Sequence, residues 1–138
     1  MLTGFLVFIS DISCLKFDIF NSKPFPGEEV IFRCSSEDHL LILFKYYGNL
    51  AKKIAYIKRN TIDSSQTQCW LNDSSPSSSY RILDCKDDVP TQLTVSKMIV
   101  DENDSGKYFC GTDAKDTDVL ESYSQTKEIS VVGVFNIY

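Results

Sequence analysis

Residues 101–111 read Asp-Glu-Asn-Asp-Ser-Gly-Lys-Tyr-Phe-Cys-Gly and contain a D-x-G-x-Y-x-C pattern made of Asp104, Gly106, Tyr108 and Cys110. An aspartate caps a turn through its side chain and a glycine accepts a positive φ, so the pattern predicts a tight turn at its start. A strand is predicted to follow, and alternate residues of a strand share one face. The tyrosine and the cysteine are therefore expected to point the same way, into a core.

This pattern resembles the variable-type domains of the immunoglobulin superfamily, whose second core cysteine follows such a turn. The resemblance covers residues 15–133 and implies an all-β, antiparallel Greek-key sandwich. It also implies a disulfide between Cys34 and Cys110 that joins the two sheets, and a tyrosine corner at Tyr108. Arg81 stands where these domains carry an arginine that pairs with the turn aspartate, so a buried Arg81–Asp104 ion pair is expected as a structural feature.

A narrower resemblance concerns function. The Tyr-Phe-Cys-Gly ending at Gly111 and the run Lys45-Tyr46-Tyr47 look like the polymeric immunoglobulin receptor-like leukocyte receptors, which carry a single variable-type domain. The resemblance implies the ligand-recognition ectodomain of a cell-surface immune receptor, which binds through its loops and front sheet. Two alternatives stay open: a secreted binder or decoy, and an adhesion module that forms a homodimer through the front sheet. The ligand, protein or lipid, is not identified by the sequence.

Length, charge and cysteine content set further limits. The 138 residues fit one domain with a full core. A net charge of −5 argues against nucleic acid or an anionic membrane as a generic partner. Five cysteines in so short a chain indicate an oxidising compartment, so a cell-surface or secreted location is expected.

The two ends of the chain are interpreted separately from the domain. Residues 1–13 hold a short apolar run that predicts a signal peptide, the alternative being a genuine first strand. Residues 134–138 form a short apolar tail, which a truncated chain would explain. No stretch approaches the ~20 apolar residues of a membrane span, so membrane attachment would need a segment outside this chain.

Strand signals recur along the domain, and the polar segment 60–79 is interpreted as a long connection. The predicted strands are 15–20, 29–34, 40–47, 53–58, 80–84, 92–98, 106–111 and 124–132. Lys97 falls at an apolar position of its strand, and a bulge that turns Met98 inward is expected to resolve this.

The strand 40–47 departs from the family, because it lacks the tryptophan that packs on the core disulfide. Family register puts Tyr47 in that place. Alternation of apolar residues suggests a different inward face, shared by Leu40, Ile42, Phe44 and Tyr46.

Three cysteines remain beyond the core pair. Cys69 and Cys85 are expected to form a second disulfide, the alternative being two free thiols. Cys14 would be removed with a signal peptide or form an intermolecular bridge. Trp70, the single tryptophan, would cover the second disulfide or contact a ligand.

Two Asn-Asp-Ser triplets match the acceptor pattern for N-glycosylation. Asn72 lies in the hydrophilic connection, and Asn103 lies in the turn before the last cysteine. Both are candidate glycosylation sites.

The front sheet and the loop after Gly111 carry the candidate ligand contacts. If Tyr108 and Cys110 point inward, their neighbour Phe109 points outward, and a large apolar side chain on an open face often marks a contact. Acidic residues of the loop and basic residues near strand 40–47 would give the face a charge asymmetry that steers a partner, the alternative being a solvated surface. The candidates are Phe109, Asp113, Asp116, Asp118 and Lys45.

Catalytic, metal and cofactor sites are not predicted. The only histidine, His39, lies in a loop segment, and the sequence has no G-x-S-x-G, H-E-x-x-H or phosphate-cradling glycine loop. The aspartates after Gly111 lack the D-x-[DN]-x-[DN]-G arrangement of a calcium loop. The sequence therefore favours recognition over enzymatic activity.

Overall fold

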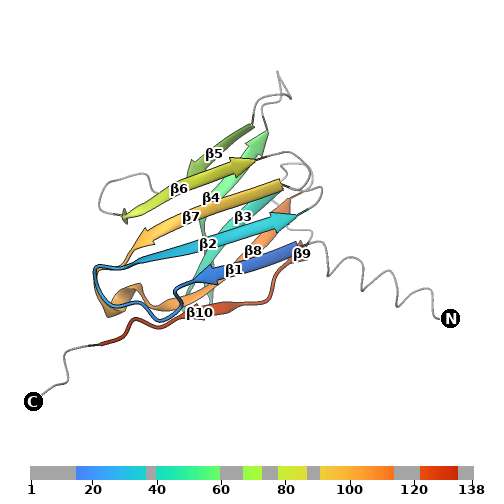
Figure 1. Cartoon of the computed structure of the whole chain (residues 1–138). Helices are drawn as coiled ribbons and strands as arrows, with labels where there is room; N and C mark the ends of the chain where they lie inside the picture. The colour runs from blue at the N-terminus through green and yellow to red at the C-terminus, as the bar shows by residue number, and fades with distance from the viewer. Residues whose placement is uncertain are drawn as a thin grey trace, which may run out of the picture.

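The chain folds into two antiparallel sheets that pack face to face, as the computed structural model shows (Figure 1). The structure describes residues 15–36, 40–59, 67–72, 78–86, 91–113 and 122–133. Its secondary structure is almost entirely strand within these ranges. The predicted fold class, an all-β immunoglobulin-like sandwich, is confirmed.

The first sheet has four strands in the order β1-β2-β7-β6. Their bounds are Leu15–Phe20 for β1, Glu29–Ser36 for β2, Thr91–Met98 for β7 and Tyr80–Lys86 for β6. The second sheet has the order β10-β8-β3-β4-β5, and the short β9 pairs with β8. Their bounds are Lys127–Ile129 for β10, Gly106–Asp113 for β8, Leu40–Tyr47 for β3, Leu50–Arg59 for β4, Thr67–Leu71 for β5 and Ser122–Tyr123 for β9.

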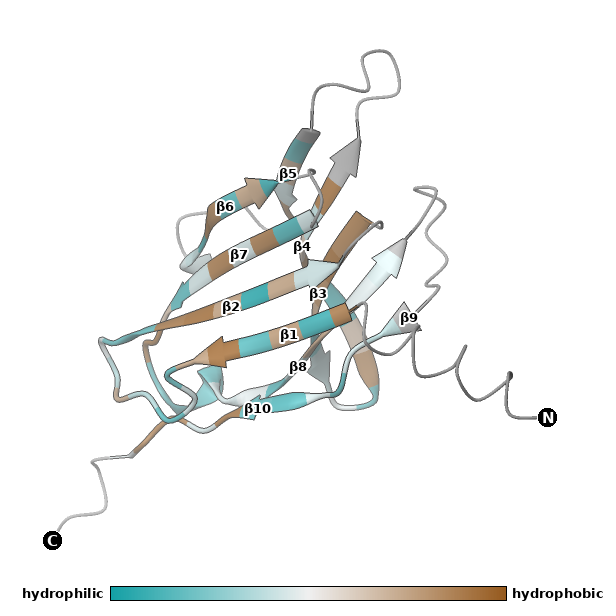
Figure 2. Ribbon diagram, turned by 45° about the vertical axis from the view of Figure 1, so that its right-hand side comes forward, coloured by the Kyte–Doolittle hydropathy of each residue, from teal (hydrophilic) through white to brown (hydrophobic). Residues whose placement is uncertain are grey.

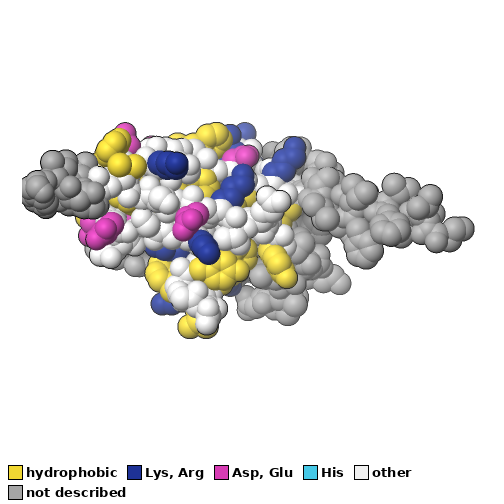
Figure 3. Space-filling view, turned by 90° about the horizontal axis from the view of Figure 1, so that it is seen from below, with side chains coloured by type: hydrophobic (Ala, Val, Ile, Leu, Met, Phe, Trp, Pro, Cys, Tyr) yellow, Lys and Arg dark blue, Asp and Glu magenta, His cyan; other side chains and the backbone are white. Residues whose placement is uncertain are grey.

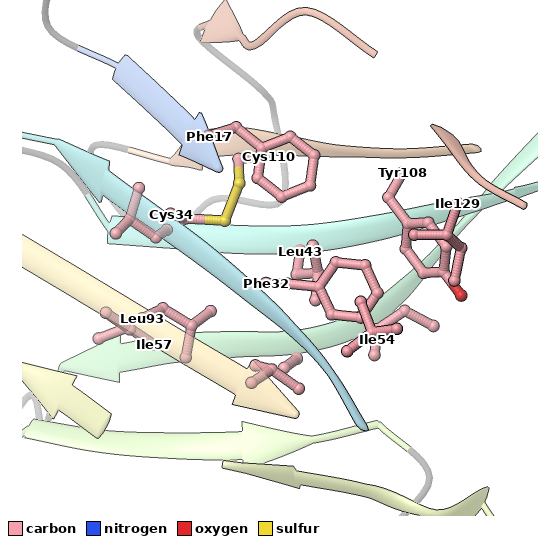
Figure 4. Close-up of a cluster of buried hydrophobic side chains, with 14 of the residues drawn as sticks. Phe17, Phe32, Cys34, Leu43, Ile54, Ile57, Leu93, Tyr108, Cys110 and Ile129 are labelled. Carbon is pink, nitrogen blue, oxygen red and sulfur yellow. A yellow bond between two sulfur atoms is a disulfide. The ribbon is translucent and has the colours of Figure 1, made fainter. Parts of the chain in front are cut away.

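The core lies between the sheets and follows the alternation of each strand. Figure 2 shows hydrophobic and hydrophilic residues alternating along β1. In β2, Val30, Phe32 and Cys34 are buried, and the residues between them are partly exposed. The labelled core side chains of both sheets fill the space between the sheets, and the Cys34–Cys110 bond lies at one side of this cluster, beside Phe17 (Figure 4).

Strand β3 is buried on both faces, and its orientation differs from both expectations. Leu41 and Leu43 belong to the main core, and Leu43 is the Cα partner of Cys110. Ile42 and Phe44 lie in a second cluster on the other face of the strand. Leu43 therefore takes the place opposite the core disulfide, and Tyr47, which is 46% exposed, does not.

Strand β5 was not expected, because segment 60–79 is polar. It pairs antiparallel with β4, with Trp70 opposite Tyr56 and Cys69 opposite Ile57. The strand extends the second sheet by one member and brings Cys69 to the edge of the core.

The turn before β8 is a short 3-10 helix, η2, at Glu102–Asp104. The Asp104 carboxylate accepts hydrogen bonds from the backbone of Val100 at 2.6 Å and of Asp101 at 3.3 Å, as a turn-capping aspartate should. Gly106 does not have a positive φ, so the predicted reason for this glycine is wrong. Instead, a Cβ at Gly106 would lie 2.8 Å from Cε of Lys45. The glycine leaves room for that lysine side chain.

The expected inward turn of Met98 does not occur. Lys97 is 6% exposed and Met98 is 45% exposed, so the lysine itself faces inward. The Lys97 ammonium donates hydrogen bonds to the carbonyl of Ser78 and the hydroxyl of Ser79. These partners and a nearby carboxylate let the strand keep its register with a buried cation.

Within the described ranges, no helical segment has the length and apolar character needed to cross a bilayer. The same residues contain no cluster of three or more histidine, cysteine, aspartate or glutamate side chains arranged to hold a metal ion.

Candidate binding surface

A second apolar cluster lies on the outer face of the β8-β3-β4 part of the second sheet. It consists of Ile42, Phe44 and Phe109, which are 5%, 9% and 5% exposed. The rings of Phe44 and Phe109 stack with their centroids 4.8 Å apart. Since the outer face of an antiparallel sheet is ordinarily polar, this cluster, which we call the front-face cluster, is the most unusual apolar feature outside the core.

Tyrosines surround the front-face cluster. Tyr46 lies 5.0 Å from Phe109 by ring centroids, and Tyr56 also packs on the cluster. Tyr123 of β9 makes an edge contact with Phe109 at 6.3 Å and is 71% exposed. A tyrosine offers an apolar ring and a polar hydroxyl, which suits a contact surface that is partly wet.

One basic residue of β4, Lys53, contributes to the same face. The Lys53 ammonium lies 5.2 Å from the centre of the Tyr56 ring, within the range of a cation–π contact. Trp70 lies opposite Tyr56 on β5 and is 46% exposed. The aromatic surface thus continues from β8 across β3 and β4 to β5.

The predicted ligand contacts do not all reach this face. Phe109 lies in the front-face cluster, whereas Asp113 is the last residue of β8, where its backbone pairs with Leu40. Asp116 and Asp118 lie outside the described residues. Of these four predicted ligand contacts, Phe109 is the one that the structure places in the front-face cluster.

Lys45 is on the opposite side from the one expected. It is 7% exposed, and its ammonium lies 5.5 Å from the centre of the Tyr108 ring, between the sheets. The reason is the orientation of β3: Leu41, Leu43 and Lys45 share one face, and that face is the inward one. Lys45 cannot be a front-face contact.

Both disulfides join the two sheets. Cys34 of β2 is bonded to Cys110 of β8, and Cys69 of β5 is bonded to Cys85 of β6, each with a Cα–Cα distance of 6.0 Å. The first bond joins β2 and β8, which are inner strands of their sheets, and the second joins the edge strands β5 and β6. Cys14 lies outside the described residues. The two bonds fit an oxidising compartment.

The expected ion pair between Arg81 and Asp104 is wrong. Arg81 pairs with Glu29 at 3.6 Å, and its side chain is 72% exposed. Asp104 pairs with Lys97 at 3.5 Å, and both of these side chains are largely buried. Arg81 points outward because β6 alternates, and the inward-facing Lys97 of the neighbouring strand supplies the buried positive charge instead.

The Tyr108 hydroxyl has a partner other than the one a tyrosine corner would give it. It lies 3.1 Å from the hydroxyl of Tyr80 on the opposite sheet. Burial raises the pKa of Tyr80 far above its ordinary value, and the charge of Tyr108 and the hydrogen bond add to this. Burial also raises the pKa of Tyr108, while its hydrogen bond with Tyr80 opposes the increase. The pair is therefore neutral at physiological pH.

The candidate glycosylation sites are both on the surface. Asn72 follows β5 and Asn103 lies in η2, and both residues are exposed, as an acceptor must be.

Trp70 lies next to Cys69 in β5, so its ring is on the other face of the strand from the disulfide. It does not cover that bond.

The residues that the sequence reasoning missed are mostly cations and tyrosines. Lys97, Tyr80 and Lys52 were not singled out as site residues. The one usable signal was Lys97, a lysine at an apolar strand position.

No family model matches the sequence, and no curated protein is significantly similar to it.

Proposed function

We propose that this chain is a variable-type immunoglobulin domain that recognises a protein partner outside the cell, as the ligand-binding part of a leukocyte-type receptor. The observation that carries the proposal is the front-face cluster. Protein interfaces are enriched in tyrosine, tryptophan and phenylalanine at their centres, and this face combines all three.

The strand order supports the variable type. Variable-type domains add two strands, beyond those of constant-type domains, next to the third strand of the front sheet. Here β4 and β5 continue the second sheet beyond β3. The disulfides support an extracellular site of action, since such bonds persist in oxidising compartments.

The apolar character of the face supports a broad, flat contact rather than a small-molecule pocket. Phe44 and Phe109 are packed tightly against each other, so they form a rigid floor. Tyr123 stands beside them and is mostly exposed. A partner would bury the exposed Tyr123 ring, and an aromatic ring loses little conformational entropy on burial because it has few rotatable bonds.

The test is binding of fluorescent tetramers of the full chain to a panel of leukocytes. Tyr123→Glu places a charge at the exposed edge of the front-face cluster without entering the core. Met98→Glu is the matched control, because Met98 is 45% exposed and lies on the other sheet. We expect Tyr123→Glu to abolish staining and Met98→Glu to retain it.

Two outcomes would contradict the proposal. Equal staining by both variants would move the contact away from the front face. A dimer of the unmodified chain in sedimentation velocity, dissolved by Tyr123→Glu, would instead support the adhesion module, because the same face would then be occupied by a second copy.

A further inference from the structure

A cavity of about 340 Å³ lies at the end of the sandwich where β3 turns into β4 and where β7 leads into η2. This end is opposite the one at which β3 begins and β8 ends, and η2 marks it in Figure 1. The volume lies at the lower end of the range for small-molecule sites. The lining that matters here comes from both sheets and from η2: Lys45, Tyr47, Lys52, Tyr80, Lys97 and Asp104.

Lys45 is the central residue of the cavity. Its side chain is 7% exposed, yet its ammonium makes no hydrogen bond or ion pair with any described residue. Among the residues that the structure describes, the rings of Tyr47 and Tyr108 are its cation–π partners, with their centres 5.0 Å and 5.5 Å from the ammonium. The ammonium reaches the cavity, where no described carboxylate forms an ion pair with it, and burial of the side chain lowers the pKa of Lys45, with attraction from Asp104 opposing and repulsion from Lys97 adding to the effect.

The fold makes room for this unpaired charge. Glycine at position 106 leaves space for the Lys45 side chain as it lies here, because a Cβ at that position would approach Cε of Lys45 to 2.8 Å and the lysine would have to shift. Strand β8 thus leaves space beside Gly106 for the side chain of Lys45 on β3.

The charges around the cavity do not balance. Asp104 is already engaged by Lys97 and by two backbone N–H groups. Lys45 and Lys52 remain, and their ammonium groups lie 5.0 Å and 5.1 Å from the centre of the same Tyr47 ring. Two positive charges thus stand beside one half-exposed aromatic ring, in a chain whose net charge is −5.

The distribution of charge in the cavity differs from that at the edge of the molecule formed by β1 and β10. Seen from below, basic and acidic side chains are interspersed over the edge formed by β1 and β10 (Figure 3). Lys127 there lies 4.0 Å from Asp18, so its charge has a partner. The excess positive charge of the cavity is a local feature.

We propose that the cavity binds a phosphate or sulfate monoester of a small polyol or sugar, with the oxyanion held between Lys45 and Lys52 and the organic part against the Tyr47 ring. A phosphate monoester is mostly a dianion at pH 7 and would balance both ammonium groups, whereas a sulfate monoester is a monoanion and would balance one. Charge-assisted hydrogen bonds to either oxyanion are stronger than neutral ones. The site is separate from the front-face cluster and does not depend on the function proposed above.

The test is an NMR titration of the full chain, produced in a bacterial periplasm so that the disulfides form and Asn72, at the cavity, carries no glycan. Glucose 6-phosphate, glucose 6-sulfate and inorganic phosphate are added at constant ionic strength, with sodium chloride as the blank. The test variants are Lys45→Met and Lys52→Met. The control variant is Lys16→Met, which removes one positive charge from an exposed position of β1.

We expect saturable shifts of cavity resonances with both esters, and weaker ones with inorganic phosphate. Lys45→Met and Lys52→Met should each weaken ester binding by about tenfold or more, the loss of one charge-assisted hydrogen bond. Lys16→Met should bind like the unmodified chain. Lys52 is exposed, so its variant keeps the test valid if Lys45→Met does not fold.

A final comparison separates the two sources of such an ester. Vesicles of phosphatidylcholine with a minor share of phosphatidylinositol 4-phosphate are tested beside glucose 6-phosphate. Vesicle binding that requires Lys45 identifies a lipid headgroup, and its absence identifies a free ester. The proposal is overturned if no ester gives saturable shifts, if sodium chloride gives the same shifts, or if ester binding is unchanged in Lys45→Met and Lys52→Met.

Discussion

Lys97 Nζ lies 3.5 Å from Asp104 Oδ1, with the two side chains 7% and 17% exposed, and this pair fixes the η2 end of the sandwich. The carboxylate also closes the turn through Val100 and Asp101, so one residue links β7, η2 and the start of β8. The lysine thus does what an arginine on β6 was expected to do.

Removal of the buried cation should therefore destabilise the domain strongly. Lys97→Met leaves the Asp104 carboxylate without its ion pair, and breaking a buried pair costs about 3 kcal/mol. Arg81→Met removes only an exposed pair with Glu29, and such pairs contribute about 1 kcal/mol or less. Urea unfolding of both variants measures the difference, and an equal loss would restore Arg81 to the structural role.

The two disulfides should differ in their contribution to stability. They close loops with sequence separations of 76 and 16 residues. In the chain-entropy model, these correspond to about 4.5 and about 3 kcal/mol. Paired alanine variants, Cys34→Ala with Cys110→Ala and Cys69→Ala with Cys85→Ala, compared by denaturant unfolding, should show the larger loss for the first pair. The reverse order would mean that strand β5 and its bond, rather than the central bond, dominate the stability.

The Tyr80–Tyr108 pair should make the domain sensitive to alkali. The pKa of both phenols is raised in the folded state, by burial first, whereas unfolded tyrosines ionise near pH 10. Stability from this pair is thus complete below about pH 10 and falls as the pH rises further, because only the unfolded state releases these protons. Phenolate absorbance during an alkaline titration should show two of the seven tyrosines ionising only on unfolding, and Tyr80→Phe should leave one. Ionisation of all seven before unfolding would be incompatible with the buried pair.

Gly106 and Lys45 should be coupled energetically. Gly106→Ala alone places a Cβ against the lysine side chain and should destabilise the domain by about 1 kcal/mol. In a Lys45→Ala background the same change should be neutral or stabilising, because alanine restricts the unfolded chain and the φ of residue 106 is not positive. A double-mutant cycle in urea measures the coupling. If the effects of the two substitutions on the free energy of unfolding are additive, the glycine at position 106 is not there to make room for Lys45.

The fold could be predicted because its decisive residues alternate clearly. Tyr108 and Cys110 lie in the main core and Phe109 lies in the front-face cluster, as a period of two requires. Strand β1 was predicted with its observed bounds, because it combines alternation with a proline and glycine turn at its end.

The orientation of β3 could not be predicted from alternation. Leu40 to Phe44 are all apolar, and all are buried, because one face lies in the core and the other in the front-face cluster. A strand that is apolar on both faces gives no period from which to choose the inward side. The placement of Lys45 was wrong for this reason.

The cavity could not be predicted because its residues come from both sheets. Lys97 and Arg81 are cations on neighbouring strands, and sequence alone does not say which one faces Asp104. Strand β5 was missed because its neighbours are serine, threonine and aspartate, which favour loops.

The most direct test of recognition by the front face is saturation binding of three tetramers to the same leukocytes: the unmodified chain, Tyr123→Glu and Lys52→Met. Tyr123 contacts Phe109 on the front face, and the exposed Lys52 lines the cavity. Our account predicts that Tyr123→Glu loses binding and that Lys52→Met binds with unchanged affinity. Loss of binding in Lys52→Met with full binding in Tyr123→Glu would contradict it and would assign recognition to the cavity.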